Sequence, residues 1–126
     1  MLTDAVALFL IAHGLLHLTI YVAPRDPHQR LPYDASRSWA LQGLHVGTVP
    51  MHTAAVALSA AVATLYTCAG IALDLQTSAA AGLVAAAAVT ALVLKVLWFN
   101  TWLTLGVAID LAILAAVATG WPPSLL

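Results

Sequence analysis

Hydrophobic residues follow one another along this chain in long runs, and polar residues gather in the short stretches between the runs. The first run covers about residues 4–22 and ends before Pro24. Three further runs cover about residues 48–73, 78–98 and 101–119. Each has close to the ~20 apolar residues that an α-helix needs to cross a membrane. The pattern therefore predicts four membrane-spanning helices.

The division between the third and fourth spans rests on length. Residues 79–119 are almost unbroken apolar sequence, and one helix of 41 residues would be about twice as long as the hydrocarbon layer is thick. The chain must therefore turn back, and the break is predicted at Asn100. Lys95, Trp98 and Trp102 flank this break and are residue types that favour membrane interfaces. Lys95 is expected to extend its ammonium group to the membrane surface.

The longest polar stretch, residues 24–47, joins the first two spans and contains three of the four basic residues. The fourth, Lys95, lies beside the Asn100 turn on the same side, and the other side has no Lys or Arg. Basic residues favour the cytoplasmic side, so this loop and the Asn100 turn are predicted to be cytoplasmic and both termini extracytoplasmic. Within the loop, Ser36 is expected to cap a short interfacial helix. The whole chain, residues 1–126, is thus predicted to be one all-α domain. Its fold would be an antiparallel bundle of four transmembrane helices in the bacterial plasma (inner) membrane.

Composition agrees with this class and excludes others. Hydrophobic residues make up 63% of the chain and charged residues 7%, whereas soluble domains have about 25% charged residues. A net charge of −1 gives no support for nucleic-acid binding, and a single cysteine excludes an internal disulfide bond. We find no enzyme signature and favour a non-enzymatic role. The expected partners are the lipid bilayer and a second copy or a larger membrane complex.

The first predicted span contains two histidines, and the fourth contains an aspartate near its middle. His13 and His17 are four residues apart, which places both on one face of a helix. His13 and Asp110 each lie about nine residues from the loop-side end of their spans, ~13 Å deep at ~1.5 Å per residue. Because a buried carboxylate needs a hydrogen-bonding partner, the sequence predicts a contact between His13 and Asp110. Gly106, one turn from Asp110, would leave space for that approach.

A second polar pattern lies on the second span, where His52, Ser59 and Tyr66 recur every seven residues and share a face. His17 and His52 fall at similar predicted depths on consecutive helices, so we expect them to form a pair. The predicted intramembrane cluster comprises His13, His17, His52 and Asp110. Its three histidines, His13, His17 and His52, are candidate metal ligands.

Three functions fit these residues. An accessory or structural membrane protein would use the polar side chains as links between helices, and we take this as the leading hypothesis. A haem- or metal-binding redox protein is the second, because imidazole binds haem iron and divalent metals; His17 and His52 would be the haem ligands. A small proton-coupled transporter is the third, since Asp and His inside spans serve proton transfer. Four short spans would require an oligomer for that role.

Two segments carry a resemblance. L-I-A-H-G-L-L-H-L at residues 10–18 resembles the His-Gly-x-x-His-Leu start of small uncharacterised four-span bacterial membrane proteins. F-N-T-W-L-T-L-G-V-A-I-D at residues 99–110, with G-W-P at residues 120–122, is similar to chains of that kind. In size and span number the chain also resembles DoxX-like proteins. The resemblance implies a membrane-protein class and no particular activity.

Overall fold

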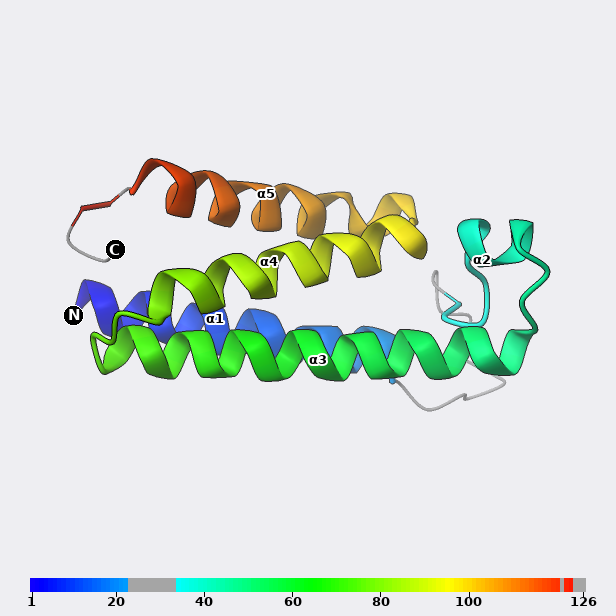
Figure 1. The fold of residues 1–126 in the computed structure, drawn as a ribbon, viewed down its shortest axis with the longest axis horizontal. Coiled ribbons are helices and arrows are strands. Elements are labelled where there is room, and N and C mark those ends of the chain that lie inside the picture. The colour runs from blue at the N-terminus through cyan, green and yellow to red at the C-terminus, as the bar shows by residue number, and fades with distance from the viewer. Residues whose placement is uncertain (23–33, 121, 124–126) are drawn as a thin grey trace.

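A computed structural model of the protein describes residues 1–22, 34–120 and 122–123, and every described element is helical (Figure 1). The long helices are α1 (Leu2–Tyr21), α3 (Thr48–Asp74), α4 (Ala80–Leu97) and α5 (Thr104–Thr119). The short elements are α2 (Trp39–Gly43) and a 3₁₀ turn, η1 (Thr101–Leu103). The prediction of an all-α fold with four long apolar helices is confirmed. These helices are long and apolar enough to cross a membrane, which indicates a multi-pass membrane protein.

The observed helix ends lie within a few residues of the predicted span ends. The break between the last two spans is at Asn100, as expected. Its side chain accepts a hydrogen bond from the backbone N–H of Trp102 at 3.0 Å and thereby caps the η1 turn. Residues 24–33 of the predicted cytoplasmic loop at residues 24–47 lie outside the described residues.

Consecutive long helices run antiparallel, and each packs mainly against the next one in the chain: α1 on α3, α3 on α4, and α4 on α5 (Figure 1). Small residues allow close approach. A Cβ atom added to Gly14 would lie 2.5 Å from Tyr66 Cβ, and one added to Gly70 would lie 2.8 Å from the carbonyl oxygen of Ala7. The backbones of α1 and α3 therefore nearly touch, and these contacts fix the register between them.

The last helix buries no apolar side chain completely, although three are half-buried against the core: Ile113, Leu114 and Val117. Every residue of α5 is described, and among them only Asp110 is buried. Leu105 and Leu111 keep 72% and 54% of their surface exposed. In a membrane, lipid covers such a surface, so burial of apolar area against the other helices contributes little to placing α5. The position of this helix therefore depends strongly on its one buried polar side chain.

The short helix α2 is fastened to the end of α4 by side chains. The hydroxyl of Ser38 donates to the carbonyl oxygen of Leu97 at 2.5 Å, and the indole N–H of Trp39 donates to that of Val96 at 2.6 Å. These two carbonyl groups lie in the last turn of α4 and have no partners within the helix. The connection between the first two spans therefore supplies hydrogen-bond donors to the C-terminal end of α4.

The predicted cap of the short helix is wrong by two residues. Ser38, not Ser36, is the N-cap, and its hydroxyl oxygen accepts a hydrogen bond from the backbone N–H of Leu41 at 3.3 Å. The backbone N–H and the hydroxyl of Ser36 both donate to the carboxylate of Asp34, which forms a local turn before the helix. Local competition for hydrogen bonds thus delays the start of α2.

Candidate functional site

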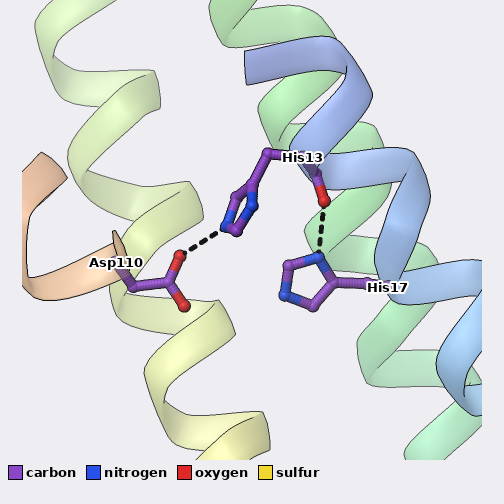
Figure 2. Close-up of side chains that lie close together, drawn as sticks. All are labelled: His13, His17 and Asp110. Carbon is purple, nitrogen blue, oxygen red and sulfur yellow. Dashed lines mark hydrogen bonds and ion pairs between the residues drawn. The ribbon is translucent and has the colours of Figure 1, made fainter. Parts of the chain in front are cut away.

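The carboxylate of Asp110 is the point at which all four spans meet. It is fully buried and accepts hydrogen bonds from a side chain of each other long helix. The hydroxyl of Tyr66 from α3 donates to one oxygen, Oδ1, at 2.7 Å. Nε2 of His13 from α1 lies 2.9 Å from the same oxygen (Figure 2). The other oxygen, Oδ2, accepts from the ammonium group of Lys95 on α4. The predicted contact between His13 and Asp110 is confirmed.

His17 extends this arrangement. Its Nδ1 atom lies 2.9 Å from the backbone carbonyl oxygen of His13, and its Nε2 atom lies 2.7 Å from Nζ of Lys95. A carbonyl oxygen can only accept, so the hydrogen-bonding pattern places the proton on Nδ1. Nε2 of the neutral ring then accepts from the ammonium group. We refer to His13, His17, Tyr66, Lys95 and Asp110 as the polar network.

Aromatic contacts orient the rings of this network. The ring of His13 meets the edges of His17 and Tyr66, each with centroids 5.1 Å apart and nearly perpendicular planes. On its outer side, Phe9 stacks on His13 at 5.7 Å. Tyr66 reaches both histidines because Gly14 lets α3 approach α1 at this level. The imidazoles are therefore held by ring packing as well as by hydrogen bonds.

The expected position of the Lys95 ammonium group at the membrane surface is wrong. Lys95 is only 2% exposed, and its side chain extends into the bundle. The reason is geometric: side chains on a helix point towards its N-terminus, and Lys95 lies near the C-terminal end of α4. A Cβ atom on Gly106 would lie 2.8 Å from Cε of Lys95. Gly106 thus makes room for the lysine stem, not for the approach of His13 as predicted.

His52 does not join the network, and the predicted pair of His17 with His52 is wrong. The contact of Gly14 with Tyr66 places a residue near position 63 of α3 level with His17. His52 is half-buried and lies about eleven residues, or ~16 Å, farther along α3. The prediction assumed that the two helices end at the same level. With 27 residues, α3 instead extends well beyond the 20-residue α1 (Figure 1).

The sequence signals for the two missed members, Tyr66 and Lys95, were present. Tyr66 belongs to the seven-residue pattern on α3, of which Ser59 is buried as well. Lys95 is the sole basic residue in the four long helices, and Asp110 follows it after the turn at Asn100. An unpaired lysine and an unpaired aspartate on an antiparallel hairpin are natural ion-pair partners.

Three members of the network also form a group with metal-ligating chemistry. One ligand atom each from His13, His17 and Asp110 lie within 4.8 Å of one another, and all three residues are buried. The third candidate metal ligand is therefore Asp110, and not His52 as the sequence predicted. The ammonium group of Lys95, bonded to both His17 and Asp110, is part of the same constellation.

No protein-family model, no curated protein and no solved structure matches the chain. The resemblance of its histidine motif to small four-span bacterial membrane proteins, and its similarity in size to DoxX-like proteins, remain predictions.

Proposed function

We propose that this protein is an accessory or structural component of the bacterial plasma membrane, and that the polar network is a clasp that holds its four spans in one arrangement. One observation carries the proposal. Asp110, the single buried residue of α5, is hydrogen-bonded to a side chain from each of the other three spans. A helix with so little buried apolar surface needs such a polar anchor to keep its place.

The charges of the network favour this role. Lys95 and Asp110 neutralise each other, and both are at least 97% buried. Neutral side-chain hydrogen bonds between membrane helices contribute only about 0.6 kcal/mol on average. Removing one partner of a buried ion pair, by contrast, costs about 3–5 kcal/mol because the other charge is left unpaired. The ion pair therefore supplies most of the strength of the clasp, and the histidines and the tyrosine set its geometry.

The orientation that we propose follows from the remaining basic residues. Arg25, Arg30 and Arg37 all lie in the loop between the first two spans, and burial of Lys95 removes it from the comparison. Three arginines on this side of the spans, against no Lys or Arg on the other side, favour a cytoplasmic loop and extracytoplasmic termini.

The haem-binding and proton-transport hypotheses require other arrangements of the same histidines and aspartate. A bis-histidine haem would need His17 and His52 at one level, and the α1–α3 register separates them by ~16 Å. The described geometry therefore does not support His17 and His52 as a haem ligand pair. Proton-coupled transport by an oligomer remains a prediction. A flux assay on Asp110→Asn in membrane vesicles tests it, since loss of the carboxylate would abolish proton coupling.

Hydrogen exchange in detergent micelles tests the clasp. Asp110→Leu should speed amide exchange in α5 by about tenfold or more, equivalent to about 1.4 kcal/mol of local stability, because the helix loses its anchor. Asp74→Asn, which alters an exposed carboxylate at the end of α3, is the matched control and should leave exchange in α5 unchanged. Equal exchange in α5 of Asp110→Leu and of the unmodified protein would refute the clasp.

A further inference from the structure

The hydrogen bonding of His17 is of the kind that prepares an imidazole to bind a metal ion. Its Nδ1–H is held by the backbone carbonyl oxygen of His13 at 2.9 Å, which fixes both the ring and the tautomer. Metal-ligating histidines commonly donate their second ring N–H to such a carbonyl group. The lone pair on Nε2 of His17 then points into the centre of the network, towards Lys95.

Two more donors converge on the same place. Nε2 of His13 lies 2.9 Å from Oδ1 of Asp110, and the ligand atoms of His13, His17 and Asp110 are all within 4.8 Å of one another (Figure 2). Two imidazoles and one carboxylate suit divalent first-row metals such as zinc and cobalt. All three residues are at least 93% buried, so a bound ion would be shielded from water.

A positive charge already occupies this place. The ammonium group of Lys95 is hydrogen-bonded to both Nε2 of His17 and Oδ2 of Asp110. An ion bound by these atoms would lie where the ammonium group now lies. We propose that His13, His17 and Asp110 form a site for one divalent transition-metal ion, and that Lys95 is a tethered cation that fills this site in the metal-free protein.

The position of Lys95 allows the exchange. It lies two residues before Leu97, the last residue of α4, so a change in the conformation of its flexible stem can bring the ammonium group to the membrane surface. The stem passes Gly106, where the absence of a side chain leaves it room to move. His13 also has to change: the proton on Nε2 moves to Nδ1, which frees Nε2 to bind the ion.

The consequence goes beyond a static clasp. With the ammonium group in the site, Asp110 links α5 to α1, α3 and α4. With a metal ion in the site, coordination by His13, His17 and Asp110 keeps α1 and α5 together, while α4 loses its ion pair. The metal would thus change which helices the network joins.

Cobalt(II) is a suitable probe, because its visible absorption reports coordination by imidazole. We expect the purified full-length protein in detergent micelles to bind about one Co²⁺ per chain. Lys95→Met should bind Co²⁺ about tenfold or more tightly, since no tethered cation competes with the ion. Lys95→Arg keeps a positive charge and should bind no more tightly than the unmodified protein. His52 lies away from the site, so His52→Ala should bind Co²⁺ with the same affinity as the unmodified protein.

Three results would overturn the proposal: no uptake of Co²⁺ by the unmodified protein, equal affinity in Lys95→Met, or full affinity after His17→Ala. Should Lys95→Met fail to fold, as judged by circular dichroism and gel filtration, the unmodified protein and His17→Ala still decide the outcome. The clasp is measured separately by hydrogen exchange in α5 without added metal, so the two proposals can fail independently.

Discussion

Nζ of Lys95 lies 2.7 Å from Nε2 of His17, although the two residues are 78 positions apart and come from helices that pack mainly against α3 and not against each other. The lysine bridges the bundle and joins the imidazole of α1 to the carboxylate of α5. One buried cation thus connects three of the four spans. Its energetic role can be measured by substitution.

We expect Lys95→Met and Asp110→Leu to compensate for each other. Each single substitution should lower the free energy of unfolding by about 3–5 kcal/mol, because it leaves an unpaired charge in an apolar interior. The double variant should recover most of this loss, since both charges are gone. Unfolding in mixed micelles measures all three variants. Additive losses in the double variant would show that Lys95 and Asp110 act independently.

A glycine series separates close packing from helix propensity. Gly14→Ala should destabilise the protein by about 1–3 kcal/mol, because its Cβ would lie 2.5 Å from the Cβ atom of Tyr66, which cannot move without its helix. Gly106→Ala should cost less, since the atom it meets belongs to the flexible stem of Lys95. Gly82→Ala meets nothing within 4 Å and should stabilise α4 by about 0.5–1 kcal/mol.

Thermal unfolding of the three glycine variants in the same detergent measures this order. A loss of stability in Gly82→Ala as large as that in Gly14→Ala would contradict the close approach of α1 and α3, because of the three substituted glycines only Gly14 lies between these helices.

Tyr66→Phe removes the hydrogen bond from the tyrosine hydroxyl to Asp110 and leaves the ring packing in place. The expected cost is about 0.6 kcal/mol and at most about 1.7 kcal/mol, the range found for side-chain hydrogen bonds between membrane helices. Thr64→Val on the same helix is the control, because the threonine hydroxyl bonds only to the backbone of Ala60 on its own helix. If both substitutions cost the same, the bond to Asp110 contributes no stability.

Ser38→Ala should loosen the attachment of α2 to α4. It removes both the helix cap and the hydrogen bond to Leu97, so we expect a loss of about 1 kcal/mol and faster exchange of the Leu41 amide. Ser36→Ala is the matched control, because that hydroxyl contacts only the exposed Asp34. Hydrogen exchange measured by NMR distinguishes the two. Equal exchange of the Leu41 amide in both variants would argue against Ser38 as the cap.

The positions of polar residues within the apolar runs were enough to predict one contact inside the bundle correctly. His13 and Asp110 lie at matching distances from the ends of their spans, and since helix rise is constant, this spacing was enough to predict their contact. The same reasoning failed for His17 and His52 because it treated the ends of α1 and α3 as level. Register between helices depends on which side chains interlock, here Gly14 with Tyr66, and no count along one helix contains that information.

The sequence by itself determined the number of spans, their approximate ends and the break at Asn100, because these depend on local hydropathy and on helix length. Only the tertiary structure decided the membership of the polar network. Lys95 was expected at the membrane surface, yet it is buried. The direction of its side chain near the end of α4 and the space over Gly106 allow this position, and the negative charge of Asp110 stabilises it. These neighbours meet Lys95 only in the folded bundle, and the hydropathy pattern along the chain does not specify which residues become neighbours.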